Sequence, residues 1–363
     1  MGVLEAYRSI LKSLLKIYSP SGDEERAVKE FIRISRELGL EAYIDEYGNG
    51  VAKWGRGRIS IAFIGHIDTV PGYIEVSESE NGIRGRGAVD AKGPLAAMLS
   101  ALSSIRIRGS VPEDLATIYV IASVGEESDS RGALGLINKG FKADAIVIGE
   151  PTNTSKIAIG YRGSLKILIE CSSVGGHSSA PWIYDSACEK IFELWGKISS
   201  TYGGSSASST SAALTMVRCG EYANVIPRSG SAVVDLRYPP KGPGWREILE
   251  SLEKIAPAGC RVSLLKDPIE PVEVRPTIPV VRSLIRAVSK AGMKPELVIK
   301  TGTSDMNLLY GRVGENIAAY GPGRSELSHT EYEEISYWEF EKGIEVYEKF
   351  VEIYLKNHAS NEG

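Results

Sequence analysis

Long apolar runs, basic residues in excess and closely spaced cysteines are all missing from this 363-residue chain. No apolar stretch approaches the ~18 residues that a membrane-spanning helix needs. The opening residues 1–20 place apolar side chains at helical spacing, which is typical of an amphipathic helix and not of a secretory signal. Lysine and arginine total 42 against 46 acidic residues, so the basic excess of a nucleic-acid-binding protein is absent. We expect neither a membrane nor a nucleic acid as a partner.

Cysteine is scarce as well, and its placement is uninformative as a motif. The four cysteines are scattered and form no CxxC pair; they are Cys171, Cys188, Cys219 and Cys260. Closely spaced pairs are what mark thiolate metal sites and redox motifs. We interpret the four residues as buried free thiols in a reducing cytosol, and we expect a cytoplasmic protein.

The first part of the chain has a sequence pattern typical of an α/β domain. A chain of this length favours about two domains. Up to residue 160, short β-branched runs alternate with helical stretches, an alternation typical of a largely buried sheet covered by helices. The predicted strands are 41–45, 59–65, 116–122 and 144–149, and the predicted helices are 22–38, 92–105 and 132–139.

From residue 164 the pattern changes to β-α-β-β-α-β, which is typical of a ferredoxin-like α+β module. A Ser/Gly-rich stretch at 199–212 lies between its first helix and second strand and is expected to be a mobile loop. After residue 270 the alternation of predicted strands and helices resumes, so the module is predicted to be inserted into the first domain. The expected domains are residues 1–163 with 269–363, and residues 164–268.

Three of the four histidines stand in loops of small residues, within GHIDTVPG, VGGHSSAP and SELSHTEYE. His66 follows the predicted strand 59–65, and ligands of open α/β sheets gather at the carboxyl ends of strands. Asp68 falls on the same side of an extended chain and could hold the second imidazole nitrogen of His66. A polar turn after a strand is the alternative interpretation.

Carboxylates follow two other predicted strands. Glu126 and Glu127 leave the strand 116–122, and Glu150 leaves the strand 144–149. Asp90 precedes the helix 92–105, where it could serve simply as an N-cap. Solvated loop carboxylates are the alternative for the three glutamates. The glycines around Asp90 fit neither phosphate-binding pattern, GxxxxGK[ST] or GxGxxG.

Taken together, these residues indicate a site for two metal ions. Adjacent carboxylates such as Glu126 and Glu127 repel each other unless a cation lies between them. Their side chains point in different directions, so one can bind metal while the other acts as a base. Two histidines and three carboxylates, with one carboxylate shared, make a ligand set for two divalent ions. Nitrogen and oxygen ligands without thiolate suit zinc, and cobalt or manganese could substitute.

In their order along the chain, these motifs resemble those of the dinuclear zinc aminoacylases and exopeptidases. That family includes acetylornithine deacetylase, succinyl-diaminopimelate desuccinylase and glutamate carboxypeptidase, and the likeness runs nearly from end to end. It implies a zinc-exopeptidase-like catalytic domain, with a mixed sheet flanked by helices. It also implies that residues 164–268 form an inserted lid that dimerises, so that the protein is a homodimer.

The same resemblance implies catalytic and metal-binding roles. It makes Glu126 the general base and Asp68 the residue that orients the first metal ligand. Asp90 would bridge two zinc ions, or two cobalt ions. The other ligands would be His66 and Glu150 on one ion, and Glu127 and His329 on the other.

In the lid, GGHSSAP matches the family motif whose histidine contacts the scissile carbonyl, from the neighbouring subunit in dimeric members. That residue is His177. The family positions that grip the substrate carboxylate match Asn224, Arg237 and Thr303. The planar guanidinium of Arg237 suits bidentate pairing with a carboxylate, although a salt bridge within the sheet would explain it equally. The Ser/Gly-rich loop departs from the family pattern.

Within the family, GRGAVDAKGPLAAM and SHTEYEEIS are most similar to the lysine/ornithine hydrolases of carrier-protein amino-acid biosynthesis. Those enzymes cut the isopeptide bond between the terminal glutamate of an amino-group carrier protein and the α-amino group of lysine or ornithine. The resemblance therefore implies a hydrolase of lysine or arginine biosynthesis. The alternatives are a deacetylase or desuccinylase of small acyl-amino acids, a broad aminoacylase or dipeptidase, and a non-catalytic metal-binding regulator.

Overall fold

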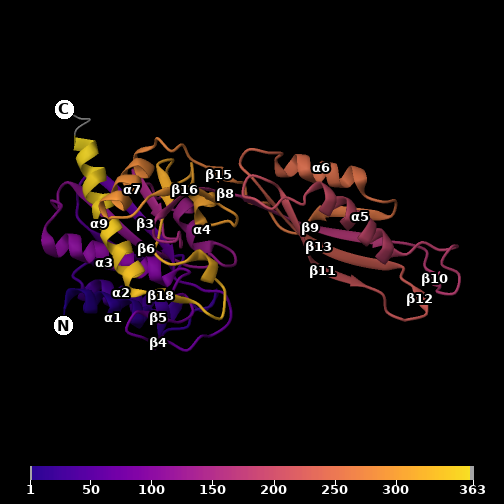
Figure 1. The fold of residues 1–363 in the computed structure, drawn as a ribbon, viewed down its shortest axis with the longest axis horizontal. Helices are drawn as coiled ribbons and strands as arrows, with labels where there is room; N and C mark the ends of the chain where they lie inside the picture. The colour runs from indigo at the N-terminus through magenta and orange to yellow at the C-terminus, as the bar shows by residue number, and fades with distance from the viewer. Residues whose placement is uncertain (1, 360–363) are drawn as a thin grey trace. The chain divides into compact units, whose positions relative to one another are not determined.

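The computed structural model describes residues 2–359, which form two compact units (Figure 1). The first unit contains the chain up to Ile159, then Val274–Val298 and the chain from Ser304 onward. The second contains Gly160–Glu273 and Ile299–Thr303. Assignment of the first unit to catalysis and of the second to a lid and dimerisation stays a prediction. None of the helices in the described part of the chain combines the length and apolar character that a membrane span requires.

A mixed sheet forms the centre of the first unit. Its middle strands β6, β3, β7 and β17 are parallel neighbours, and antiparallel strands flank them in the order β1-β2-β6-β3-β7-β17-β8. The strands are β1 (Glu41–Ile44), β2 (Gly50–Trp54), β3 (Ile59–His66), β6 (Ala116–Ser123), β7 (Ala145–Ile148), β8 (Lys156–Tyr161) and β17 (Ile317–Ala319). Strands β15 (Val272–Glu273) and β16 (Glu296–Lys300) pair with β8, and β4 (Ser77–Glu78), β5 (Gly82–Arg84) and β18 (Glu334–Ser336) form a small separate sheet.

Helices cover the central sheet. They are α1 (Val3–Leu15), α2 (Glu25–Glu37), α3 (Lys92–Arg108), α4 (Arg131–Asn138), α7 (Pro279–Lys290), α8 (Asp305–Leu309) and α9 (Tyr337–Ala359), with a 3-10 turn η1 (Ser325–Leu327). Helix α2 is amphipathic and buries Val28, Phe31 and Ile32 on one side. Helix α3 differs because residues 92–105 are buried on all sides, which is expected of a helix packed in a core. It packs against α1, α9 and β3.

The second unit is a four-stranded antiparallel sheet with two helices on one face, in the order β11-β13-β9-β14. Apolar side chains of alternate strand residues, such as Val234 and Leu236, pack against the helices and form the core of this unit. Its elements are β9 (Gly163–Ser172), α5 (Ala187–Thr201), β11 (Ser211–Cys219), β13 (Ser229–Tyr238), α6 (Trp245–Ile255) and β14 (Cys260–Leu264). A two-stranded ribbon, β10 (Gly176–His177) and β12 (Val225–Ile226), completes it.

The predicted fold class, a mixed α/β sheet flanked by helices with a β-α-β-β-α-β module, is confirmed. Each predicted strand and helix has a counterpart within a few residues. Strands β2 and β8 and the very short strands were not predicted from the sequence. Strand β8 precedes β9 with only Arg162 between them. The apolar run of β8 therefore lies next to the predicted domain boundary at residues 163–164 and was not recognised as a separate strand.

The prediction of four free thiols is wrong. Cys171 is bonded to Cys260 and Cys188 to Cys219, and none of the cysteines in the described chain is free. Cys171 and Cys260 are direct partners in the pairing of β9 with β14, with Cα atoms 4.0 Å apart. The second bond joins the first turn of α5 to the end of β11. Antiparallel pairing brings together residues 89 apart in sequence, which spacing alone cannot reveal.

Both disulfides close loops within the second unit, so we expect them to stabilise that unit. Replacing Cys188 and Cys219 by alanine should lower its free energy of unfolding by about 2–5 kcal/mol, since the unfolded loop regains its conformational entropy. Denaturant unfolding with and without a thiol reductant measures this change. The double variant should respond less to reductant than the unchanged chain does. Four titratable thiols in the unreduced, unfolded protein would contradict both bonds.

Candidate metal centre

Three adjacent parallel strands end at the same edge of the central sheet, in the order β6-β3-β7. Each has a histidine or glutamate, residue types that bind metal ions, at its end or shortly after it. His66 is the last residue of β3 and lies opposite Ser123 of β6. Glu126 and Glu127 follow β6, and Glu150 follows β7. The carboxyl edge of a parallel sheet is the usual position of an α/β site.

His66 is only 2% exposed, and both of its ring nitrogens have close neighbours. Nδ1 lies 2.9 Å from the backbone carbonyl oxygen of Asp68, and Nε2 lies 3.0 Å from Oδ1 of Asp90. A proton on Nδ1 would be donated to that carbonyl, leaving the lone pair of Nε2 directed at Asp90, as metal ligation requires. The Asp68 carboxylate stands farther off, 3.6 Å from Nδ1. The backbone of Asp68, rather than its side chain, therefore makes the hydrogen bond that orients His66.

The Asp68 carboxylate instead organises the turn after β6. It accepts the backbone N–H groups of Glu126 and Glu127, each at 3.1 Å, and the hydroxyl of Ser21 at 2.7 Å. Burial alone would raise its pKa, but His66, Ser21 and the backbone N–H of Glu127 together lower the pKa of Asp68 to about 2. An ionised Asp68 thus fixes the backbone that carries the two adjacent glutamates.

Two groups of potential ligands share one residue, Asp90. The first is His66, Asp90 and Glu150; the second is Asp90, Glu127 and His329; in each, the ligand atoms lie within 4.8 Å of one another. Nε2 of His329 lies 2.7 Å from Glu127 and 3.5 Å from Oδ2 of Asp90. These are the two sets that the family resemblance implies. A further group of His66, Glu126 and Glu127 also has its ligand atoms within that distance, so the individual roles stay predictions.

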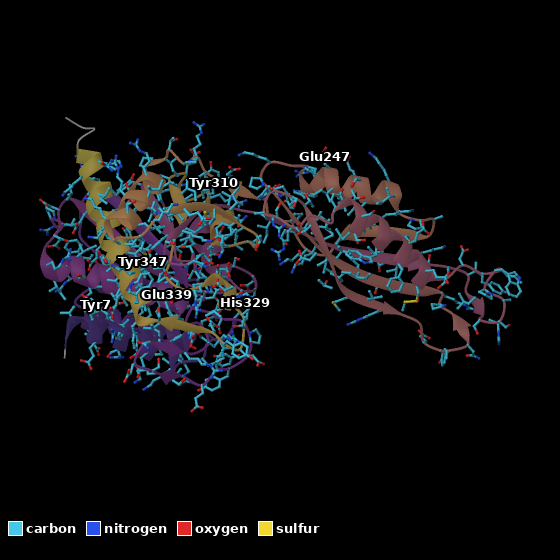
Figure 2. All side chains as sticks on the ribbon, viewed as in Figure 1. Tyr7, Glu247, Tyr310, His329, Glu339 and Tyr347 are labelled. Atoms are coloured by element: carbon cyan, nitrogen blue, oxygen red, sulfur yellow. A yellow bond between two sulfur atoms is a disulfide. The ribbon has the colours of Figure 1, made fainter. Side chains whose placement is uncertain are left out.

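His329 approaches from a loop between η1 and β18 (Figure 2). Its φ of 63° lies in the left-handed region, which residues other than glycine adopt rarely and usually where the surrounding structure enforces it. In the first turn of α3, Gly93 allows the Asp90 loop to pack closely, because a Cβ there would stand 2.2 Å from the carbonyl oxygen of Ala88. A left-handed residue on one side and a glycine on the other therefore accompany the place where His329 and Asp90 meet.

The charges at this edge fit a cation. Burial raises the pKa of Glu126, and the neighbouring Glu150, Asp305 and Glu127 raise it further, against the opposing effect of His66. The hydrogen bond to Glu127 raises the pKa of His329. Carboxylates crowded in a buried place compete for positive charge, which protons or metal ions can provide. Imidazole and carboxylate donors together suit a borderline divalent ion such as zinc.

Asp305, the first residue of α8, belongs to this charged region and was missed by the sequence analysis. It is 3% exposed, and its Oδ2 accepts the hydroxyl of Ser123 at 3.0 Å. Burial raises the pKa of Asp305 to about 7. Asp305 lies two residues after Thr303, for which the family resemblance predicts a role in substrate binding. Its proximity to Glu126 depends on the packing of α8 against the sheet, and the sequence carries no signal for that.

Glu333 is a second missed residue, and it ties the Asp90 loop to the His329 loop. Its side chain is 1% exposed, and Oε1 accepts the backbone N–H groups of Gly87, Val89 and Asp90 at 2.9–3.0 Å. Its Oε2 pairs with the guanidinium of Arg86 at 2.8 Å. We call this arrangement the Glu333 clamp. Three acidic residues follow His329 closely in the sequence, and nothing in their spacing distinguishes Glu333.

The predicted substrate residues lie in the second unit. His177 of β10 is exposed, and the backbone N–H of Ser179 donates to its Nδ1 at 3.1 Å. A neutral His177 therefore carries its proton on Nε2, where it can donate to a carbonyl oxygen. Asn224 is adjacent, since its carbonyl accepts the N–H of Ser178. Arg237 lies 3.4 Å from the hydroxyl of Thr303 and pairs with a neighbouring aspartate.

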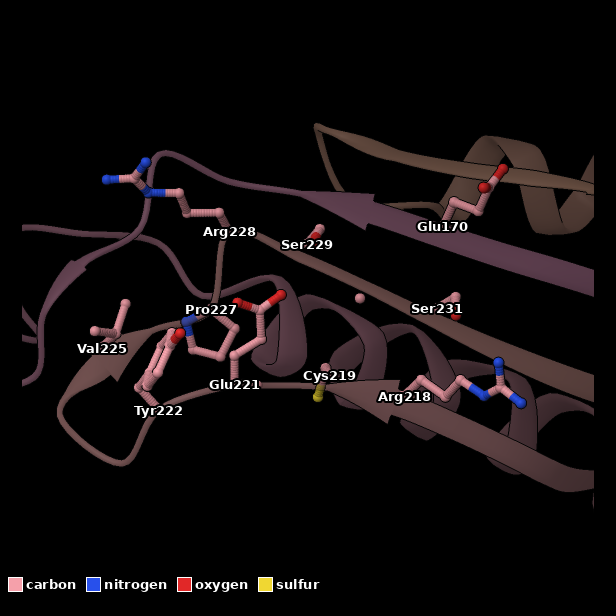
Figure 3. A pocket seen from close by; sticks show the side chains of 12 residues that line it. Glu170, Arg218, Cys219, Glu221, Tyr222, Val225, Pro227, Arg228, Ser229 and Ser231 are labelled. Carbon is pink, nitrogen blue, oxygen red and sulfur yellow. The ribbon is translucent and has the colours of Figure 1, made fainter.

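A pocket of about 830 Å³ also lies in the second unit, between the end of β11, the start of β13 and the turn before β12 (Figure 3). Cys219, Tyr222 and Arg228 line it, together with Arg218 and Glu221. It contains none of the predicted metal ligands. The candidate site in this chain is therefore inferred from the convergence of charged side chains and not from the size of a cavity.

The Glu333 clamp predicts an effect on metal binding. In Glu333→Gln, an amide N–H must face either the three backbone donors or Arg86, so the Asp90 loop loses its anchor. We expect metal affinity to fall by roughly 10–100-fold, as for other residues that hold a ligand in place. Chelator competition with Zn²⁺ measures this affinity. Glu334→Gln is the matched control, since Glu334 is exposed and pairs with Arg324 at the surface. Wild-type affinity in a folded Glu333→Gln variant would contradict the role of the clamp.

Comparisons with known proteins place the chain in a family. Residues 62–353 match the model of peptidase family M20/M25/M40. A relative from Sulfurisphaera tokodaii, named LysW-lysine/LysW-ornithine hydrolase, is 38% identical over 330 residues, covering 91% of this chain and 90% of the relative. A relative of the same name from Saccharolobus islandicus is 38% identical over 348 residues, with 95% of each chain covered.

Solved structures share the fold. Aminopeptidase PepT from Bacillus cereus superposes with a TM-score of 0.82 at 21% identity, covering 97% of this chain and 100% of that one. The M20 family metallo-carboxypeptidase Sso-CP2 from Sulfolobus solfataricus gives a TM-score of 0.76 at 15% identity, covering 98% and 100%. A Bacillus subtilis protein described as a dinuclear metal binding peptidase from the M20 family gives 0.74 at 14% identity, covering 98% and 99%. With the family model matched over most of its length, the chain belongs to peptidase family M20/M25/M40.

Proposed function

We propose that this chain is a metal-dependent amidohydrolase that releases lysine, ornithine or both from an amino-group carrier protein. The reaction class rests on two ligand groups that share Asp90, with Glu126 beside them. The substrate rests on relatives at 37–39% identity that are named as hydrolases of LysW-linked lysine and ornithine. The release step belongs to lysine and arginine biosynthesis in this proposal.

The proposed cofactors are two divalent ions, zinc or alternatively cobalt. His66, Asp90 and Glu150 would hold one ion, and Asp90, Glu127 and His329 the other. When bound, such ions polarise a carbonyl and lower the pKa of water, which supplies a nucleophile at neutral pH. The histidines must be deprotonated to serve as ligands, so binding is coupled to proton release.

Glu126 is the proposed general base. It accepts a proton from the attacking water and later delivers that proton to the leaving amine, which restores the carboxylate. The neighbours that raise its pKa make it a stronger base than a solvated glutamate. Its backbone N–H is bound by Asp68, which fixes the start of the side chain.

The lid residues would bind the substrate. His177 donates from Nε2 to the scissile carbonyl as negative charge develops on its oxygen. Arg237, Thr303 and Asn224 grip the α-carboxylate of the amino acid that is released. We also propose a homodimer, in which the lid of one subunit presents His177 to the partner subunit.

Replacing the proposed base should separate catalysis from metal binding. In Glu126→Gln we expect hydrolysis to fall by roughly 10²–10⁴-fold, because the amide cannot accept the proton. Elemental analysis should find metal near the wild-type content. Asp129→Asn, at an exposed position of the same turn, is the control and should keep full activity. Loss of metal in Glu126→Gln would make Glu126 a ligand, and unchanged turnover would exclude it as the base.

The substrate proposal predicts a preference between donors. The enzyme should hydrolyse carrier-linked lysine or ornithine with a higher kcat/KM than Nα-acetyl-lysine or Nα-acetyl-ornithine. Steady-state assays with both pairs of substrates decide this. Equal or better turnover of the acetyl compounds would favour a small-molecule deacetylase instead.

A further inference from the structure

One end of the lid sheet gathers positive charge on the face opposite its helices. On β13, Leu236 points into the core while Asp235 and Arg237 share the open face. Asp235 is the register partner of Lys166 on β9, so their side chains stand next to each other on that face. Lys266 follows β14. The residue before it, Leu265, donates its backbone N–H to the carbonyl oxygen of Lys166.

Two cations pair with a single carboxylate here, and a third cation, Lys266, follows the neighbouring strand β14. Asp235 receives the guanidinium of Arg237 in a bidentate pair, with distances of 3.0 and 3.1 Å. The ammonium of Lys166 lies 3.6 Å from the same carboxylate. Partial burial lowers the pKa of Lys266, and so do Lys166 and Arg237, while Asp235 is the one carboxylate that opposes them. The end of the sheet thus carries more positive than negative charge.

The backbone around this cation group is held firmly. Arg162 is 7% exposed, and its guanidinium donates to the carbonyl of Thr301 at 2.9 Å and to the hydroxyl of Ser211 at 2.9 Å. It also donates to the carbonyl of Ser209, which secures the end of the Ser/Gly-rich loop. Burial, followed by the charge of Arg237, lowers the pKa of Arg162. A buried cation adds to the positive potential on the open face and fixes its neighbours.

A carrier-linked substrate offers two carboxylates to such a group. One is the α-carboxylate of the lysine or ornithine, which is assigned above to Arg237. An isopeptide bond uses the side-chain carboxyl of the carrier's terminal glutamate, so the chain-terminal carboxylate of that glutamate remains free. An acetyl donor has no counterpart to it. The second carboxylate therefore distinguishes the two substrate classes chemically.

We propose that Lys166 and Lys266, beside the Asp235–Arg237 pair, form a second carboxylate subsite that binds the free carboxylate of the acyl donor. This inference rests on the proposed function and deepens it, because it names the group by which the enzyme selects a γ-glutamyl donor. Asp235 keeps Lys166 and Arg237 in place until the two substrate carboxylates bind. Charge-assisted hydrogen bonds from two ammonium groups supply the selectivity.

Two matched small substrates isolate the subsite. Nα-(γ-glutamyl)-lysine carries the free carboxylate, and Nα-(4-aminobutanoyl)-lysine is the same molecule without it. For the unchanged enzyme we expect kcat/KM to favour the first by roughly 10–100-fold, as for a hydrogen-bonded charge. In Lys166→Met and Lys266→Met this ratio should fall severalfold, and in the double variant to near one. Lys241→Met, an exposed lysine of the same unit paired with Glu273, should keep the ratio.

The outcomes separate the two proposals. A wild-type enzyme that hydrolyses both substrates equally, or a ratio that survives in the double variant, would overturn the subsite and leave the hydrolase proposal standing. Hydrolysis of Nα-acetyl-lysine with neither γ-substrate accepted would overturn the proposed function, and the subsite with it. Unfolding midpoints of all variants show whether a change in ratio reflects lost structure.

Discussion

Negative charge crowded at the carboxyl edge of β3, β6 and β7 is the constraint on which the first unit depends. Glu126, Glu127 and Glu150 reach that edge from neighbouring strands, and Asp90 meets them from the loop before α3. Carboxylates so close together in a partly buried place repel one another unless positive charge is supplied. Two divalent ions would provide positive charge that suits these side chains. The chain also belongs to a family with a member described as a dinuclear metal binding peptidase, which agrees with this interpretation.

Two further carboxylates hold this arrangement without belonging to either group that shares Asp90. Asp68 binds the backbone N–H groups of the turn that carries Glu126 and Glu127, and Glu333 binds three backbone N–H groups of the Asp90 loop. Backbone donors fix the position of a loop more tightly than side-chain contacts, because they leave no rotamer free. The fold thereby positions the proposed ligands without the help of an ion.

The two units are stabilised in different ways. In the first, α3 is buried on all sides and packs against α1, α9 and β3, so a large apolar core supports the site. The second unit is smaller, and its single-sided core is supplemented by two disulfides. Covalent links restrict the unfolded chain where the apolar area is limited. A firm sheet in the second unit in turn gives Lys166 and Arg237 a fixed separation.

Local sequence determined much of this protein. Apolar periodicity and Gly-bounded loops sufficed for the main strands and helices, because those signals arise from neighbours along the chain. The motifs around His66, Asp90 and His329 indicated a metal site, since few other roles need histidine and carboxylate at strand ends. Tertiary structure decided what depends on distant segments. The disulfides need the register of β9 with β14, and the clamp needs the loop of Glu333 folded over that of Asp90. Pairing and loop packing are set by the global fold, and residue spacing carries no record of them.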